Sequence, residues 1–147
     1  MALHYTSGEV ASVARHQVMP LLDRYRILTF QGPLGAGKTT LIKELLLACG
    51  VKQTVTSPSF GYVNTYADDK GRVFHHFDLY RIGSVEGFVA SGFDELLYQE
   101  GAICLIEWPE VIATLLSDTP LRPHVCAIAI SYELDDMTTR CIEIKPR

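Results

Sequence analysis

The sequence has no apolar run long enough to cross a bilayer. A membrane-spanning helix needs about 20 consecutive apolar residues, and no stretch of this chain approaches that length. The first residues, MALHYT, contain neither the basic segment nor the apolar segment of a secretory signal. We therefore expect a cytoplasmic protein that does not associate with membranes.

Closely spaced metal-binding or disulfide-forming residues are also missing. The four cysteines lie among apolar neighbours without CxxC spacing, which predicts reduced, mostly buried thiols. Cys126 and Cys141 would face each other if the two strands that carry them pair, but nothing in the sequence requires a bridge. Apart from His76, the histidines have no partner at metal-ligand spacing, and we expect surface or core roles for them: His4, His16, His75 and His124.

Positive charge is scarce. The chain has 13 Lys and Arg against 17 Asp and Glu, a formal net charge of −4. A protein that binds a nucleic-acid backbone unaided carries a basic stripe, and none is present here. If RNA is part of the biology, we expect another component to hold it.

What the sequence does contain is the alternation of strands and helices of an α/β protein. With 147 residues and 48% hydrophobic residues, we expect a single domain covering 1–147. The patterns predict strands at 26–30, 54–55, 60–66, 72–77, 102–106, 125–132 and 138–144, and helices after Thr6, after Lys38, and over 85–91, 93–98 and 109–116. The fold class predicted is α/β, with a central mixed, mainly parallel sheet flanked by helices.

A glycine-rich loop lies between the first of these strands and the second helix. Residues 32–39 satisfy G-x-x-x-x-G-K-[ST], the P-loop pattern, in the strand–loop–helix context that it requires. Backbone N–H groups of such a loop surround phosphate oxygens, and the helix N-terminus favours their negative charge. We expect Lys38 to reach the β- and γ-phosphates, Thr39 to bind Mg²⁺ and Thr40 to bond the α-phosphate.

A P-loop also needs an acid at the end of a neighbouring strand to anchor Mg²⁺, directly or through water. Two residues qualify. Glu107 ends the apolar run ICLI, and Asp78 ends the strand VFHHF. Either is also explained as a helix cap or a surface carboxylate, so the residues alone leave the choice open.

Four segments occur in order along the chain: GAGKTTL (35–41), TSPSF (56–60), HFDLYR (76–81) and IEWP (106–109). Together they resemble the TsaE family, also called YjeE, over residues 6 to about 144. The resemblance implies a P-loop fold, Mg²⁺ and ATP as cofactors, and slow ATP hydrolysis. It further implies a role in the threonylcarbamoyl modification of the adenosine beside the tRNA anticodon, with TsaB and TsaD as partners and tRNA contacted only through that complex.

The same resemblance implies roles for single residues. Glu107 and Thr39 would be the protein ligands of Mg²⁺, and Asp78 would lie beside them or orient the attacking water. Residues 57–60 would form a switch that senses the γ-phosphate. Around the nucleotide we expect Glu9, Gly35, Ala36, Gly37, Lys38, Thr39, Thr40, Ser59, Trp108 and Arg140. Glu9 is also explained by a capping box with Thr6, and Trp108 by the core.

Other P-loop functions fit less well. A small-molecule kinase is the main alternative, but such enzymes carry an arginine-rich lid and an acceptor-binding insertion that this chain lacks. No N-K-x-D segment for guanine and no LSGGQ-like signature of an ABC ATPase occurs. A nucleotide-gated binding module, whose hydrolysis resets a complex, merges with the TsaE interpretation.

Overall fold

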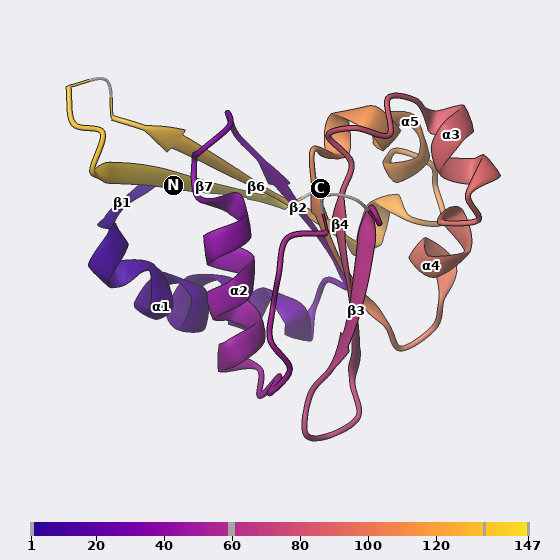
Figure 1. Ribbon diagram of the computed structural model, residues 1–147, viewed down its shortest axis with the longest axis horizontal. Helices are drawn as coiled ribbons and strands as arrows, with labels where there is room; N and C mark the ends of the chain where they lie inside the picture. The colour runs from indigo at the N-terminus through magenta and orange to yellow at the C-terminus, as the bar shows by residue number, and fades with distance from the viewer. Residues whose placement is uncertain (1, 59–60, 134, 147) are drawn as a thin grey trace.

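The protein is built on a seven-stranded sheet with a parallel centre and antiparallel edges (Figure 1). The computed structural model describes residues 2–58, 61–133 and 135–146. The strand order is β1-β7-β6-β2-β5-β4-β3. The strands are β1 (Ala2–Thr6), β2 (Ile27–Gln31), β3 (Val63–Ala67), β4 (Val73–Asp78), β5 (Ile103–Glu107), β6 (Val125–Tyr132) and β7 (Thr139–Pro146).

The predicted α/β fold with a mixed sheet is confirmed. Parallel pairing joins β6, β2, β5 and β4, whereas β1, β7 and β3 are added by antiparallel pairing. The six pairings are therefore evenly divided, and the parallel ones form the centre of the sheet rather than most of it. In a parallel sheet the carboxyl ends of neighbouring strands meet at one edge, where sites of α/β proteins form.

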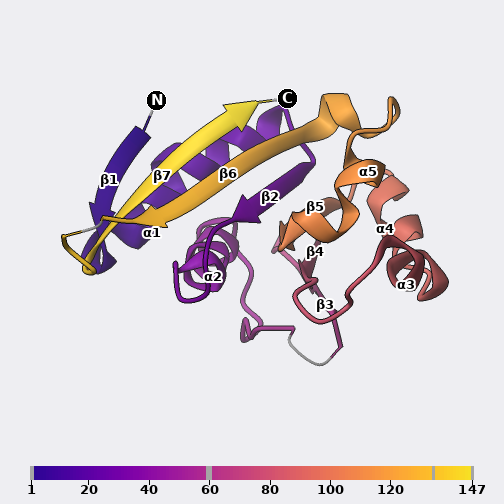
Figure 2. The same ribbon diagram turned by 90° about the horizontal axis from the view of Figure 1, so that it is seen from above.

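Helices cover the two faces of the sheet in separate groups (Figure 2). One apolar cluster packs the first helical segment and α2 (Lys38–Ala48) against one face. The other cluster packs α3 (Val85–Ala90), α4 (Asp94–Tyr98) and α5 (Ala113–Leu116) against the opposite face. Among the described residues no helix is long and apolar enough to cross a membrane.

Strand β5 shows why the central strands are apolar. All five of its residues are buried. Because side chains alternate along a strand, Leu105 points into the cluster around α2, while Cys104 and Ile106 point into the cluster around α3 to α5. The prediction of a strand buried on both faces is confirmed. Burial raises the pKa of the Cys104 thiol to about 12.

The first helical segment begins at the predicted capping box. The Thr6 backbone N–H and hydroxyl donate to Glu9 Oε2 over 2.7 and 3.0 Å. Short 3₁₀ (Ser7–Glu9) and α (Val10–Val13, α1) turns lead into a π-helical turn (Ala14–Val18) and a second 3₁₀ turn (Met19–Asp23). Pro20 lies at the start of that last turn.

Three local predictions need correction. Residues 54–55 form no strand, although Val55 is buried in the core. Residues 2–6, for which no strand was predicted, form the edge strand β1. The register of β6 and β7 pairs Cys126 with Pro146 and Cys141 with Ser131, so these cysteines do not face each other. All four cysteines are free thiols, as predicted.

The helix at 109–116 begins with a 3₁₀ turn (Pro109–Ile112) before it becomes α5, and another 3₁₀ turn (Arg122–His124) precedes β6. Pro109 occupies the first turn, as predicted. These two turns carry the chain from the end of β5 to the start of β6. They belong to the layer that covers the face opposite α2, and they leave the carboxyl ends of the central strands accessible.

Candidate functional site

The glycine-rich loop leaves the carboxyl end of β2 and enters α2 through three glycines with positive φ. Gly32, Gly35 and Gly37 have φ values of +157°, +75° and +96°. Gly32 also approaches β6 closely, because a Cβ atom there would lie 2.4 Å from the backbone oxygen of Ile130. The loop path thus requires the absence of a side chain at this position.

We expect Gly32→Ala to lower the free energy of unfolding by about 2–3 kcal/mol, because the new methyl group meets backbone that cannot move aside easily. Gly8→Ala is the matched control, since a Cβ atom at Gly8 meets nothing within 4 Å. That control should change stability by less than about 0.5 kcal/mol. Urea unfolding followed by circular dichroism measures both, and equal stability of the two variants would contradict this account.

Lys38, the first residue of α2, extends back over the loop. Its Nζ donates to the carbonyl oxygens of Gly32 and Pro33 over 2.6 and 3.0 Å, and it lies 4.1 Å from the centre of the Trp108 ring. The residue is only 5% exposed. Burial lowers the pKa of Lys38, while the negative charges of Glu107 and Asp78 act in the opposite direction. A single cation is therefore held beside two carboxylates at the loop.

Thr39 and Glu107 meet across the sheet edge, as predicted. The Thr39 hydroxyl lies 2.9 Å from both carboxylate oxygens of Glu107. Glu107 is 3% exposed and is the last residue of β5, directly opposite Asp78 at the end of β4. The Thr39 hydroxyl in the first turn of α2 and the carboxylates at the ends of β4 and β5 thus line one cavity, and such oxygen donors suit Mg²⁺.

His76 is a contact of the site that sequence reasoning did not assign. Its Nε2 lies 2.7 Å from Glu107 Oε2, and the two side chains are 0% and 3% exposed. The other ring nitrogen, Nδ1, is buried with no hydrogen-bond partner. The strand period would have placed His76 on the same face of β4 as Asp78, but its contact with Glu107 depends on the register of β4 against β5.

Asp78 is half-buried, and its Oδ1 accepts a hydrogen bond from the Tyr80 backbone N–H over 3.1 Å. Burial raises the pKa of Asp78, and the nearby Glu107 charge raises it further. Because the folded protein favours the protonated form, this group's stabilising contribution is present at low pH and is lost as the pH rises through its folded pKa. At neutral pH the ionised carboxylate opposes folding.

We therefore expect Asp78→Asn to raise the thermal midpoint at pH 7, because the amide removes the opposed charge and its oxygen still accepts from Tyr80. The difference from wild type should shrink when the pH is lowered from 7 to 4, because the Asp78 carboxyl becomes increasingly protonated as the pH falls. Calorimetric scans at the two pH values test this. A variant less stable than wild type at pH 7 would contradict it.

Trp108 begins the 3₁₀ turn after β5 with left-handed backbone angles, φ 58° and ψ 51°. Residues other than glycine rarely adopt these backbone angles without a functional or structural constraint. The indole packs on Tyr80 with ring centres 4.9 Å apart. With Lys38, Thr39, Asp78 and Glu107 it lines a cavity of about 270 Å³ beneath the glycine loop.

A second cavity of about 360 Å³ lies on the other side of the loop. It is lined by Tyr5, Ser7, Val10, Gly35, Ala36, Gly37, Thr40, Thr138 and Arg140. Arg140 Nε donates to the Ala36 carbonyl over 3.2 Å, and its guanidinium lies 4.1 Å from the centre of the Tyr132 ring. Gly35, Ala36, Gly37 and Thr40 line both cavities, which therefore adjoin at the loop. Sequence reasoning found Arg140 but missed Tyr5 and Tyr132.

Two further residues that were predicted to contact the nucleotide, Glu9 and Ser59, are not among the described residues that line the two cavities at the glycine loop. Glu9 Oε2 accepts the two bonds from Thr6, and Glu9 lines a different cavity between β1 and the first helical segment. Its contact with a nucleotide stays a prediction. Ser59 lies outside the described residues, as does Phe60, so only Ser57 and Pro58 of the expected switch are described. The preceding residue, Thr56, is held by Tyr66, whose hydroxyl accepts from its backbone N–H over 3.2 Å.

These features define an α/β protein with a P-loop sequence at the carboxyl end of a central parallel strand and an acid on the adjoining strand. A sequence profile of the family described as "Threonylcarbamoyl adenosine biosynthesis protein TsaE" matches residues 6–142. The chain therefore belongs to the TsaE family, and the resemblance seen in its four segments is confirmed.

Individual relatives agree with this assignment. The tRNA threonylcarbamoyladenosine biosynthesis protein TsaE of Treponema pallidum is 38% identical over 67% of this chain and 70% of its own length. The protein of the same name from Rickettsia conorii is 39% identical over 77% of this chain and 63% of its own length. That of Aquifex aeolicus is 33% identical over 87% of this chain and 83% of its own length. The crystal structure of Bacillus subtilis YdiB superposes with a TM-score of 0.70 at 25% identity, covering 100% of this chain and 87% of YdiB.

Proposed function

We propose that this protein binds Mg-ATP, hydrolyses it slowly, and acts in the threonylcarbamoyl modification of tRNA as a nucleotide-gated accessory to TsaB and TsaD. The observation that carries the proposal is the meeting of Thr39 and Glu107 at 2.9 Å beneath a glycine loop whose cation is Lys38. The family membership supports the pathway.

The donor set fits a magnesium ion. Thr39 offers a hydroxyl oxygen and Glu107 a buried carboxylate, which are the hard oxygen ligands that Mg²⁺ selects. These two residues would hold the ion, with Asp78 close enough to act directly or through water. When bound with nucleotide, the ion held by these residues would neutralise negative charge on the phosphate groups.

The other residues of the site act on the nucleotide itself. Lys38 would exchange its bonds to the loop carbonyls for bonds to the β- and γ-phosphate oxygens, since an ammonium group is a strong donor to anions. Asp78 would orient the attacking water as an acceptor. The cavity beside Tyr5 and Arg140 provides apolar and cationic surface for the base and ribose next to the loop. His76 would hold the Glu107 carboxylate in place through its 2.7 Å contact.

The gating part of the proposal rests on the segment that is expected to form the switch, of which Ser57 and Pro58 are described. Residues 57–60 follow Thr56, which is tied to β3 through Tyr66. In this proposal the γ-phosphate orders the segment and favours docking to TsaB–TsaD, and hydrolysis then resets the assembly. The net charge of −4 agrees with tRNA being held by the complex rather than by this chain alone.

The test is phosphate release by the full-length chain, alone and with purified TsaB and TsaD, together with a pull-down in the presence and absence of ATP. We expect weak hydrolysis alone, faster hydrolysis with the partners, and ATP-dependent capture. Equal turnover with and without the partners would contradict gating, and phosphate transfer to a metabolite would indicate a small-molecule kinase instead. Trp108 is the only tryptophan, so we expect its fluorescence to change when Mg-ATP is added, and no change would weaken its placement beside the nucleotide.

A further inference from the structure

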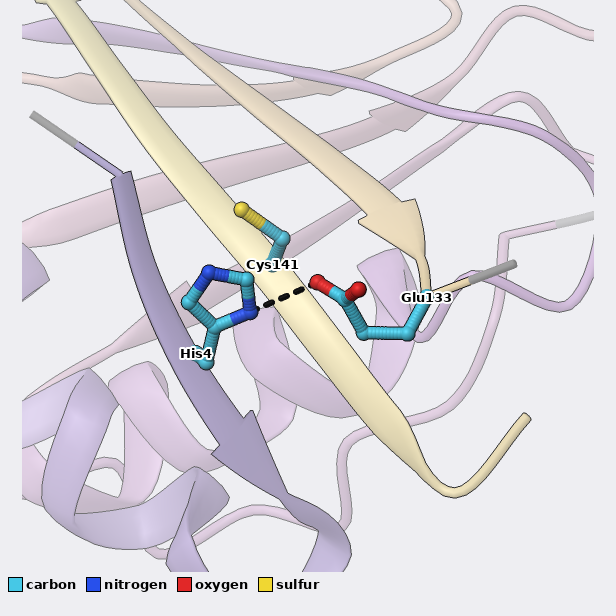
Figure 3. A group of neighbouring side chains, drawn as sticks. All are labelled: His4, Glu133 and Cys141. Carbon is cyan, nitrogen blue, oxygen red and sulfur yellow. Dashed lines mark ion pairs between the residues drawn. The ribbon is translucent and has the colours of Figure 1, made fainter. Parts of the chain in front are cut away.

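A second group of metal-ligating side chains lies at the β1–β7–β6 edge of the sheet, away from the glycine loop. His4 on β1 is directly opposite Cys141 on β7, and Cys141 is opposite Ser131 on β6. Glu133 follows the end of β6. Ligand atoms of His4, Glu133 and Cys141 all lie within 4.8 Å of one another, and His4 Nδ1 is 2.6 Å from Glu133 Oε1. Figure 3 shows the imidazole and the carboxylate facing each other over β7, with the Cys141 side chain beside them.

This cluster is on the face of the sheet opposite the nucleotide cavities. The residues next to His4 and Cys141 along their strands, Tyr5 and Arg140, line the cavity beside the glycine loop. Since neighbouring residues of a strand point to opposite faces, His4 and Cys141 point away from it. The His4 and Glu133 side chains are 59% and 39% exposed and Cys141 is half-buried, so an ion from solvent can reach all three.

We propose that His4, Glu133 and Cys141 form a zinc site, with the fourth position taken by water. An imidazole, a thiolate and a carboxylate are a typical zinc donor set. Mg²⁺ prefers oxygen ligands throughout, so the two sites of this protein select different metals. Sequence spacing could not reveal the site, because its ligands come from β1, from β7 and from the residue after β6, which only the fold brings together.

Small side-chain rotations complete the geometry. Tetrahedral zinc with ordinary bond lengths holds its ligand atoms about 3.4–3.6 Å apart. The His4–Glu133 pair would open by about 0.8–1 Å from its present 2.6 Å, and the thiol would move inward. The pair that opens is exposed, and exposed ion pairs stabilise a protein by about 1 kcal/mol or less, so little opposes the change.

Such a site would fasten an edge strand. Strand β1 is hydrogen-bonded on one side only, to β7. Zinc would join β1 through side chains to β7 and to the start of the β6–β7 turn, in addition to the backbone ladder. An ion that binds the folded state and not the unfolded state raises the stability of the protein by mass action. The ion would therefore brace the strand that carries Tyr5 into the cavity wall, whether or not a nucleotide binds there.

The test uses Co²⁺ as a spectroscopic substitute for zinc, with untagged full-length protein free of nucleotide. We expect one equivalent of Co²⁺ to produce a thiolate charge-transfer band in the near ultraviolet. Zn²⁺ should displace it and millimolar Mg²⁺ should not. Cys141→Ser should lack the band, whereas Cys49→Ser, at a half-buried thiol outside the cluster, should keep it. His4→Ala and Glu133→Gln should weaken binding by about tenfold or more, since even indirect changes at metal sites cost this much.

A second readout does not depend on the Co²⁺ charge-transfer band. Zn²⁺ should raise the thermal midpoint of wild type and of Cys49→Ser but not that of Cys141→Ser, and it should protect Cys141 but not Cys49 from maleimide, as followed by mass spectrometry. Absence of the band in wild type, or its persistence in Cys141→Ser, would overturn the proposal. So would equal affinity in wild type, His4→Ala and Glu133→Gln, which would indicate a single thiol rather than a site.

Discussion

Glu107→Gln is expected to reduce Mg²⁺-dependent ATP hydrolysis by about a hundredfold or more. The amide keeps the size of the side chain but removes its negative charge and one of the two oxygens that lie 2.9 Å from the Thr39 hydroxyl. Its remaining oxygen can still accept from His76 Nε2, so the buried imidazole keeps a partner and the fold should be retained. Phosphate release at saturating Mg-ATP measures the effect, and circular dichroism checks the fold.

Glu110→Gln is the matched control. Glu110 is exposed, lies three residues further along the chain, and is near enough to Lys38 to affect its pKa. Its loss should leave turnover within about twofold of wild type, because an exposed charge is screened by solvent. Full activity in Glu107→Gln would transfer the metal-anchoring role to Asp78, which faces Glu107 across the β4–β5 pairing.

Lys38→Met is expected to weaken ATP binding by about 30- to 150-fold. Charge-assisted hydrogen bonds contribute about 2–3 kcal/mol, and each 1.4 kcal/mol is a factor of ten in affinity. Methionine retains an unbranched apolar side chain over the Trp108 ring. Burial lowers the pKa of Lys38, so the variant removes a charge that is unfavourable to bury, and it also removes the donor to the Gly32 and Pro33 carbonyls. Calorimetric titration with Mg-ATP provides the affinity.

Lys43→Met, an exposed position on the same helix, is the control for Lys38→Met. It makes the same chemical change without altering the loop, so its affinity for ATP should equal that of wild type. If Lys38→Met unfolds at a lower temperature than both wild type and Lys43→Met, the lysine contributes mainly to the fold. Unchanged affinity would mean that phosphate is bound elsewhere.

The elements that could be predicted from sequence are those with a local signal. The glycines of residues 32–39 fix the strand–loop–helix unit because only glycine suits their backbone angles and the close approach to Ile130. The four-residue apolar run ICLI of β5 is buried on both faces, which its composition already indicates. Glu107 could be named as one of two candidate acids because it directly follows that run, whereas the choice between it and Asp78 rested on the family resemblance. Its contact with Thr39 needs only that β5 lie beside β2.

The parts that could not be predicted depend on pairing between distant segments. Residues 2–6 have no alternation strong enough to indicate a strand, and they become one by adding to β7. Residues 54–55 have high β-propensity but no neighbouring strand to pair with. The contact between His76 and Glu107 requires a particular register of β4 on β5. Tyr5 reaches the site only because β1 pairs with β7, which places Tyr5 opposite Arg140.

The seating of β1 on β7 also sets the order in which the molecule can mature during translation. The segment that becomes β1 is made early, but its only partner in the sheet emerges after β2 to β6 have been synthesised. Until then Tyr5 and Arg140 cannot come together, although the β2–loop–α2 unit between them is already complete. A nascent chain stalled before β7 would present the glycine loop without the wall formed by Tyr5 and Arg140, and the cavity of about 360 Å³ would form only when β7 docks.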